Sequence, residues 1–410
     1  MNYNEALNYI HSLGNFSMPA SLKRIKEVLE KLGNPQKKIN AIHIAGTNGK
    51  GSVSAMIANV FKTAGYKTGL FISPFIIDFR ERIQINGEYI SENDLCVFAE
   101  TVKETDVQLT EFEFITAVAF LYFSKQNVDI LVCETGLGGR FDATNVLENK
   151  KVCVITKIGL DHTAILGNTI EKITQEKCGI LRDCPVVTTF NQEIEALNVI
   201  KRHTNKLFIP ETESLSVQKC DIGNIYIYKG KKYNLKLSGD YQIENALVAQ
   251  KAVELSGYDI SDDIICEGLK NTFFPARMEI ISEKPLVVLD GAHNPDGANV
   301  LKKELLKHSG EVTAIIGMMK DKDYPEFLKT TLSCCENAVA VEVRGMPRSL
   351  SAEELCETAN KYCKATMARS YTEAIEKARF LSGQKPIFVF GSLYLASEIR
   401  KILKEIFENN

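Results

Sequence analysis

IHIAGTNGKGS, at residues 42–52, is the most informative segment of this chain. Its apolar start belongs to a run over 39–45 that is typical of a buried strand, and a glycine-rich turn follows. The segment 50–64 then has the composition of a helix, with Gly65 as its stop signal. A strand, a glycine-rich turn and a helix in this order are typical of a phosphate-binding loop.

The residue types of this turn suit a bound phosphate group. Gly46, Gly49 and Gly51 let backbone N–H groups turn inward around phosphate oxygens, and the helix that follows adds the positive end of its dipole. Lys50 supplies a cation for the β- and γ-phosphates, and Ser52 offers a hydroxyl to Mg²⁺. The turn departs from the GxxxxGK[ST] pattern, because isoleucine replaces its first glycine and a glycine separates the lysine from the hydroxyl.

The rest of the N-terminal half predicts an α/β fold. Apolar runs recur at 128–133, 152–158 and 185–190, and each is followed by a loop and a helical stretch. Continuously apolar strands that alternate with helices indicate a mostly parallel sheet. The stretch 206–238 alternates apolar and polar residues between turn signals, so we expect a small antiparallel addition there.

A domain boundary is expected near residue 277. Helices are predicted over 241–256 and 261–271, and a second α/β series follows them. Its apolar runs lie at 286–290, 312–318, 338–343 and 386–391. We therefore predict a P-loop-type ATPase domain over 1–276 and a smaller, Rossmann-like α/β domain over 277–410.

Composition excludes several classes of protein. The chain has 410 residues, of which 45% are hydrophobic and 25% charged, and its formal net charge is −3. These values favour a soluble globular protein with no nucleic acid or membrane partner. The eleven cysteines show no CxxC spacing, the N-terminus does not resemble a signal peptide, and no apolar run is long enough to cross a membrane. We expect a cytoplasmic protein that acts as a monomer.

The chain resembles the folylpolyglutamate synthase and dihydrofolate synthase family of the Mur ligase superfamily. The resemblance begins at LGNPQKKINAIHIAGTNGKGS, residues 32–52, and continues through ISPFIIDFRERIQING, 72–87, which is similar to the family's Ω-shaped loop. CETGLGGRFDATNV, 133–146, resembles its glycine-rich acidic motif, and GLDHTAILGNTIEKITQEKCGI, 159–180, resembles a segment with a histidine and a modified lysine. FPARMEI, VLDGAHNP and FGSLYLASEIR are similar to its C-terminal signatures.

This resemblance implies an ADP-forming acid–amino-acid ligase. Members of the family use ATP to convert the γ-carboxylate of a folate into an acyl phosphate, which the amine of an incoming L-glutamate then attacks. Bifunctional members also join dihydropteroate to its first glutamate. The implied small-molecule partners are ATP, a folate and L-glutamate.

The resemblance also implies magnesium ligands. Glu134, at the end of an apolar strand, and Ser73 would hold the Mg²⁺ that bridges the ATP phosphates, together with Ser52. His162, in GLDH, matches a ligand of a second Mg²⁺. Carboxylate and hydroxyl oxygens at the carboxyl end of a strand suit a hard cation and the usual place of active sites in α/β enzymes.

Lys177, in TQEKCGI, matches a lysine that CO₂ converts to N6-carboxylysine in the family. The carbamate would be an anionic oxygen ligand for the second Mg²⁺, and burial or nearby cations would favour the neutral amine that it needs. The segment departs from the family at Cys178, where Ala is usual, and at Asn168, where Asp is usual.

Further site residues are implied by their motifs. Asn245 would lie near the adenine, Arg277 would reach the phosphates and act in catalysis with Glu134, His162 and Lys177, and Asp290 would bind the nucleotide from the second domain. The loop residues implied in ATP binding are Thr47, Asn48, Gly49, Lys50, Gly51 and Ser52. The residues implied in substrate binding are Phe75, Asp142, His293 and Ser392, although the family usually has His in place of Phe75.

Two other functions stay open at the level of sequence. A Mur-type ligase of cell-wall synthesis would share the nucleotide site, although GKGS in place of GKT or GKS and the short N-terminus speak against it. A non-catalytic nucleotide-binding module would not need Glu134, His162 and Lys177 together.

Overall fold

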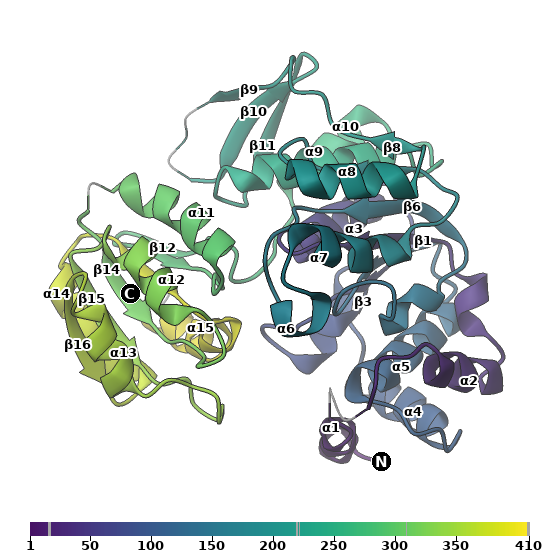
Figure 1. Cartoon of the computed structure of the whole chain (residues 1–410), viewed down its shortest axis with the longest axis horizontal. Coiled ribbons are helices and arrows are strands. Elements are labelled where there is room, and N and C mark those ends of the chain that lie inside the picture. Colours follow the sequence, from purple (N-terminus) through teal and green to yellow (C-terminus); the bar gives the residue numbers. More distant parts are fainter. Residues whose placement is uncertain (15–17, 219, 221, 309, 408–410) are drawn as a thin grey trace. The chain divides into compact units, whose positions relative to one another are not determined.

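The computed structural model describes residues 1–14, 18–218, 220, 222–308 and 310–407. The chain forms two compact units, and Figure 1 labels their elements. The first consists of Met1–Lys236 and Gln242–Phe273, and the second of Leu237–Tyr241 and Phe274–Asn410. The main division thus lies between Phe273 and Phe274, and the short segment Leu237–Tyr241 packs with the second unit, which no composition signal indicated.

A mostly parallel sheet forms the centre of the first unit. Within the described residues it has eight strands, in the order β4-β3-β2-β5-β1-β6-β7-β8. The strands from β2 to β8 along this order are parallel, whereas β3 and β4 add an antiparallel edge. Their bounds are β1 Ala41–Ala45, β2 Thr68–Phe71, β3 Ile83–Ile85, β4 Glu88–Tyr89, β5 Ile130–Glu134, β6 Lys150–Ile155, β7 Val186–Thr188 and β8 Leu207–Phe208.

The small antiparallel addition is shorter than the sequence predicted. It consists of β9 (Ser216–Gln218), β10 (Asn224–Tyr228) and β11 (Lys231–Leu235), which pair in the order β11-β10-β9. The prediction for 206–238 is wrong at its start, because Leu207 and Phe208 pair in parallel with Val186 and Val187 of β7. A helix, α8 (Ile194–His203), connects β7 to β8, and such a crossover returns the chain parallel to the preceding strand.

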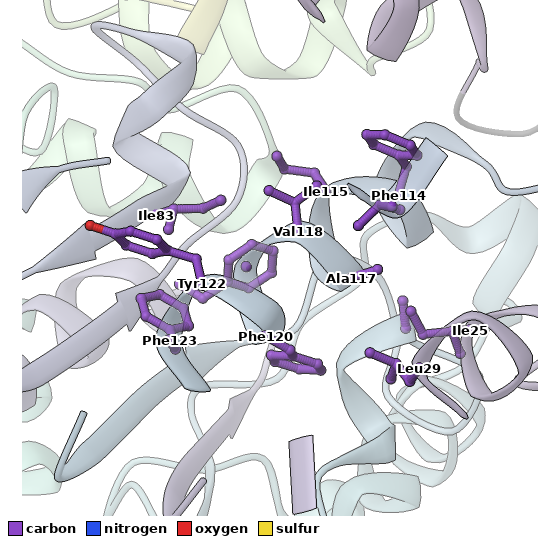
Figure 2. Packing of buried hydrophobic residues seen from close by; sticks show 14 of the residues in the cluster. Ile25, Leu29, Ile83, Phe114, Ile115, Ala117, Val118, Phe120, Tyr122 and Phe123 are labelled. Carbon is purple, nitrogen blue, oxygen red and sulfur yellow. The ribbon is translucent and has the colours of Figure 1, made fainter. Parts of the chain in front are cut away.

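Helix α5 (Glu111–Lys125) carries much of the core of the first unit. It begins with a capping box in which Thr110 and Glu113 satisfy each other's backbone N–H groups. Its apolar side chains face several directions, and Figure 2 shows them among Ile25, Leu29 and Ile83 of neighbouring elements. The fully buried rings of this helix are Phe114, Phe120 and Phe123.

The remaining helices cover the sheet and its edges. The α-helices of the first unit are α1 Tyr3–Ser12, α2 Lys23–Lys31, α3 Lys50–Thr63, α4 Glu92–Lys103, α5 Glu111–Lys125, α6 Thr163–Leu166, α7 Ile170–Lys177, α8 Ile194–His203, α9 Tyr241–Glu254 and α10 Asp262–Lys270. Short 3₁₀ turns lie at Pro35–Lys38 (η1), Phe79–Arg82 (η2), Ala143–Val146 (η3) and Cys178–Ile180 (η4).

The second unit is a separate α/β fold. Its six described strands pair in the order β12-β13-β17-β14-β15-β16, and all pairs are parallel except β12 with β13. The strands are β12 Glu279–Glu283, β13 Leu286–Leu289, β14 Thr313–Ile316, β15 Asn337–Val341, β16 Lys364–Ala368 and β17 Ile387–Phe390. The helices are α11 Pro295–Leu306, α12 Tyr324–Leu332, α13 Ala352–Ala359, α14 Tyr371–Ser382 and α15 Leu393–Phe407. The predicted fold class, two α/β domains with a small antiparallel addition, is confirmed.

All eleven cysteines are free thiols. Across the described part of the chain, no helix combines the length and the apolar character needed to span a bilayer.

Candidate nucleotide-binding and catalytic site

The glycine-rich loop follows β1 and ends at the start of α3, as predicted. Gly46 lies so close to β6 that a Cβ atom there would be 1.8 Å from Thr156 Oγ1. Gly49 precedes α3 with a φ of +89°, and a Cβ atom there would be 2.5 Å from Asn245 Oδ1. These two positions therefore require glycine for space and, at Gly49, also for backbone conformation. The N–H groups of Thr47 and Asn48 donate to the Lys157 carbonyl at 3.0 and 3.1 Å, which fixes the loop against β6.

Lys50 and Glu134 are brought together by strand register. Glu134 ends β5 and pairs with Ile44, which lies near the end of β1 just before the loop. The Lys50 Nζ atom is 3.9 Å from Glu134 Oε1, and both side chains are largely buried. A cation and a carboxylate thus share the carboxyl edge of the parallel sheet, where ligand sites of α/β folds form.

Ser73 lies beside the same carboxylate, as the resemblance implied. Its backbone N–H donates to Glu134 Oε2 at 3.3 Å, and its hydroxyl accepts a hydrogen bond of 2.9 Å from Arg82 Nη1. Arg82 also lies over the half-buried ring of Phe75, with its guanidinium carbon 5.2 Å from the ring centre. Sequence reasoning missed Arg82, although it lies in the quoted segment 72–87 and is a buried cation within this site.

Lys177 is the last residue of α7 and is 5% exposed. Its Nζ atom donates to the Gly46 carbonyl at 2.7 Å, so the side chain points at the beginning of the phosphate loop. Burial, together with the nearby positive charge of Lys50, lowers the pKa of Lys177 to about 7. Lys177 is therefore a buried amine at the phosphate loop and not a surface lysine.

The glycine-rich acidic motif packs against the end of α7. A Cβ atom on Gly139 would be 2.7 Å from the Lys177 carbonyl, and one on Gly179 would be 2.4 Å from the Cα atom of Arg140. The Arg140 N–H donates to the Glu176 carbonyl at 2.8 Å. Glycines are needed here because two backbones touch, and this contact fixes the position of Lys177.

The carboxylate of Asp142 accepts its hydrogen bonds from neighbouring residues of the same turn. Its carboxylate accepts hydrogen bonds from Leu137 N at 2.8 Å, from Thr144 N at 3.0 Å and from the Thr144 hydroxyl. Burial raises the pKa of Asp142, while these hydrogen bonds oppose that shift. Because the residue is 5% exposed and its oxygens hold the glycine-rich motif, the geometry gives it a positioning role. Its contact with substrate stays a prediction.

His162 is more exposed than Lys50, Glu134 and Lys177. It adopts a φ of +49° just before α6, its side chain is half exposed, and its Nε2 atom is 3.8 Å from Asp161 Oδ2. Among the residues that the structure describes, no three His, Cys, Asp or Glu side chains are grouped closely enough to hold a metal ion. A metal here would need other oxygen donors, such as hydroxyls, a carbamate or phosphates.

Asn245 and Ser52 are joined through α9. Gln242 donates from Nε2 to Ser52 Oγ at 3.3 Å, and it accepts a hydrogen bond of 2.9 Å from Asn245 Nδ2. This places Asn245 against the phosphate loop, where its side chain also lies close to Gly49.

The predicted residues of the second unit lie at the carboxyl ends of β13 and β17. Asp290 follows β13 and accepts hydrogen bonds from Met278 N and Ala292 N, both at 2.8 Å; burial raises its pKa and the charge of Arg277 opposes that shift. His293 Nδ1 lies 2.8 Å from the Gly291 carbonyl oxygen. Ser392 follows β17, and its hydroxyl accepts a hydrogen bond of 3.1 Å from Tyr394 N.

Lys150, at the start of β6, supports the turn after Lys177. Its Nζ atom donates to Asn145 Oδ1 at 2.9 Å and to the Ile180 carbonyl at 2.8 Å. Burial lowers the pKa of Lys150 to about 8, from 10.5 for an exposed lysine. Neutral acceptors thus hold a buried ammonium group, at a cost in stability.

This cost predicts a pH-dependent stability. Between about pH 8 and 10.5 the unfolded chain keeps a proton that folded Lys150 has released, so raising the pH favours the folded state. Over this window the free energy of unfolding of the native chain, measured in denaturant, should rise by up to about 3 kcal/mol more than that of Lys150→Met. Lys151→Met, which changes the exposed neighbour, should show the same dependence of unfolding free energy on pH as the native chain. If Lys150→Met also showed the native dependence, the buried charge of Lys150 would be contradicted.

Comparison with known proteins agrees with this geometry. Residues 44–253 match the family model of the Mur ligase middle domain, and residues 277–403 match that of the dihydrofolate synthetase C-terminal domain. The chain is 36% identical to the dihydrofolate synthase/folylpolyglutamate synthase of Bacillus subtilis, over 98% of this chain and 99% of the relative. It is also 36% identical to the folylpolyglutamate synthase of Lacticaseibacillus casei, with the same coverage.

Solved structures give the same result. Escherichia coli FolC in complex with DHPP and ADP superposes with a TM-score of 0.88 at 28% identity, covering 99% of this chain and 98% of that one. Mycobacterium tuberculosis folylpolyglutamate synthase, complexed with ADP and AMPPCP, gives a TM-score of 0.87 at 29% identity, covering 98% and 99%. The fold and the phosphate-loop site thus define a ligase of the Mur type. Within that class, the chain belongs to the dihydrofolate synthase/folylpolyglutamate synthase family.

Proposed function

We propose that this chain is an ATP-dependent ligase that joins L-glutamate to the γ-carboxylate of a folate and releases ADP and phosphate. The observation that carries the proposal is the convergence of Lys50, Glu134 and Lys177 on one glycine-rich loop. Phosphoryl transfer depends mainly on positioning and charge stabilisation, which a phosphate loop, a cation and a metal-binding carboxylate supply. Family membership supports folate and glutamate as substrates and speaks against the cell-wall alternative.

In the proposed reaction, the folate carboxylate attacks the γ-phosphorus of ATP, giving an acyl phosphate and ADP. The amine of glutamate then attacks the acyl carbon, and phosphate leaves from the tetrahedral intermediate. Lys50 and the N–H groups at the start of α3 hold the phosphate oxygens during the first step, since those of Thr47 and Asn48 bond to the Lys157 carbonyl. Arg277 and Asp290 stay proposed nucleotide contacts, whereas the contacts of His293 and Ser392 with glutamate and of Phe75 with the pterin ring rest on the resemblance alone.

The donors beside the loop fit Mg²⁺. Magnesium is usually held by one or two carboxylates together with substrate phosphates, and it prefers oxygen ligands. Glu134 supplies a buried carboxylate, and Ser52 and Ser73 supply hydroxyls. When bound, the ion would neutralise charge on the phosphates. His162, half exposed after β6, is the proposed ligand of a second ion.

Lys177 is the proposed site of a carbamate. Its amine is buried beside the Gly46 carbonyl, and an environment that disfavours the ammonium form favours reaction of the neutral amine with CO₂. The nitrogen–carbon bond forms as one proton leaves, and the product is an anion with two oxygens near the cation of Lys50. Such a group would complete an oxygen ligand set, because the described histidine, cysteine, aspartate and glutamate side chains form no group of three that could hold a metal ion.

The decisive test is substrate dependence. With Mg-ATP and L-glutamate, the purified protein should release phosphate only when tetrahydrofolate or dihydropteroate is added, and mass spectrometry should show extension of that acceptor by one glutamate. Turnover on both acceptors would show a bifunctional enzyme. Phosphate release without an acceptor, or no extension of either one, would refute the proposal. The cytoplasmic location and the monomeric state stay predictions.

A further inference from the structure

Two buried thiols face each other beneath the turn that follows Lys177. Cys153 lies on β6, and Cys184 lies in the loop before β7, two residues ahead of Val186, which is the partner of Cys153 in the strand register. Their sulfur atoms are 3.6 Å apart. The Cys153 N–H donates to the Pro185 carbonyl at 3.0 Å, so the backbone already holds the two residues side by side.

The charges around the pair favour a thiolate at Cys184. The pKa of Cys184 lies below that of an ordinary thiol, because its contact with the Cys153 side chain and the nearby ammonium group of Lys150 stabilise the thiolate against the effect of burial. Cys184 is also the entry point for a reagent, because it keeps 7% of its surface exposed beside the exposed residues Arg182 and Asp183, whereas Cys153 is fully buried.

We propose that Cys153 and Cys184 form a regulatory disulfide by exchange with a low-molecular-weight disulfide. The Cys184 thiolate attacks one sulfur of the reagent and releases a first thiolate. The Cys153 sulfur then attacks the Cys184 sulfur of the mixed disulfide, and its proton passes to the departing second thiolate, which leaves as a thiol. Two protein thiols are thereby oxidised while one small disulfide is reduced to two thiols, so electrons balance.

The disulfide would act on the turn that holds Lys177. The Cys153 thiol donates to the Ile180 carbonyl at 3.5 Å, and Ile180 ends η4, which directly follows Lys177. Oxidation removes this donor and draws the two sulfur atoms from 3.6 Å to about 2.05 Å. The loop between α7 and β7 must therefore shift toward β6, and Lys177 is displaced from Gly46. The predicted loss of activity rests on the proposed function, whereas formation of the disulfide does not.

The test uses the full chain equilibrated in oxidised and reduced glutathione, quenched with acid, alkylated and mapped without reduction. We expect a peptide that links Cys153 to Cys184, reversed by dithiothreitol, in the native chain and in Cys220→Ser, but not in Cys184→Ser or Cys153→Ala. A disulfide between a different pair of cysteines, or no disulfide at all, would refute the proposed Cys153–Cys184 pair.

The same samples test the effect on the active site. Oxidation should lower ligase turnover on the order of tenfold or more in the native chain, and it should leave Cys184→Ser unchanged. A linked peptide with undiminished turnover would overturn the regulatory role. Absence of turnover in the fully reduced native chain would count against the proposed function alone, because the peptide map does not depend on activity.

Discussion

Replacing Lys177 with alanine should lower folate-dependent turnover by about 10³-fold or more while nucleotide binding and fold persist. The substitution removes the amine that would carry the carbamate, and with it an anionic ligand at the phosphate loop. It also removes the hydrogen bond to the Gly46 carbonyl, but it leaves the packing of the glycine-rich motif against the α7 backbone intact. The measurement is steady-state phosphate release with tetrahydrofolate and glutamate, together with a thermal unfolding curve.

Chemical rescue separates a ligand role from a structural one. Acetate or formate can occupy the space of the missing side chain and supply carboxylate oxygens, so either should restore part of the activity of Lys177→Ala. Lys172→Ala changes an exposed lysine on the same helix and should leave turnover at the native level. Full activity of Lys177→Ala would refute the metal-ligand role, and a folded but inactive variant without rescue would argue against the carbamate.

The strands that sequence predicted are those with continuous apolar runs. The central strands β1, β5 and β6 are buried along nearly their whole length, so most of their residues are apolar. The exceptions are His43 in β1, Glu134 at the end of β5, and Lys150 and Lys151 at the start of β6. The strands β12 and β16 were missed because Glu279–Glu283 and Lys364–Ala368 include polar or partly exposed positions. The strand β2, Thr68–Phe71, was missed because its four residues include a threonine and a glycine.

Site residues were predictable from the sequence where they lie at the end of a predicted strand or the start of a predicted helix. Glu134 lies at a strand end and Lys50 at a helix start, so their meeting follows from parallel register. The burial of Lys177 was not visible, because its helix sequence is polar and its partner, Gly46, is distant in the chain. The internal role of Asp142 was equally hidden, since it depends on hydrogen bonds within one compact turn.

Replacing Glu134 with glutamine should lower turnover by about 10³-fold by removing a single negative charge. Glutamine has nearly the same shape, and its amide oxygen can still accept the hydrogen bond from Ser73 N. The positive charge of Lys50, 3.9 Å away, then lacks its counter-charge, and the proposed Mg²⁺ lacks its carboxylate ligand. Stability should change little, whereas the metal-dependent part of nucleotide binding should be lost.

Calorimetric titration of ADP with and without Mg²⁺ distinguishes these effects. In the native chain, Mg²⁺ should strengthen ADP binding. In Glu134→Gln, the ADP affinity without Mg²⁺ should be retained or raised, because Lys50 no longer pairs with a carboxylate and can bind the phosphates. The increase in affinity on adding Mg²⁺ should be lost in this variant. Glu27→Gln, on an exposed helix face, is the matched control and should keep the native response. If Mg²⁺ strengthened binding equally in Glu134→Gln, the carboxylate would orient Lys50 and Ser73 without ligating the ion.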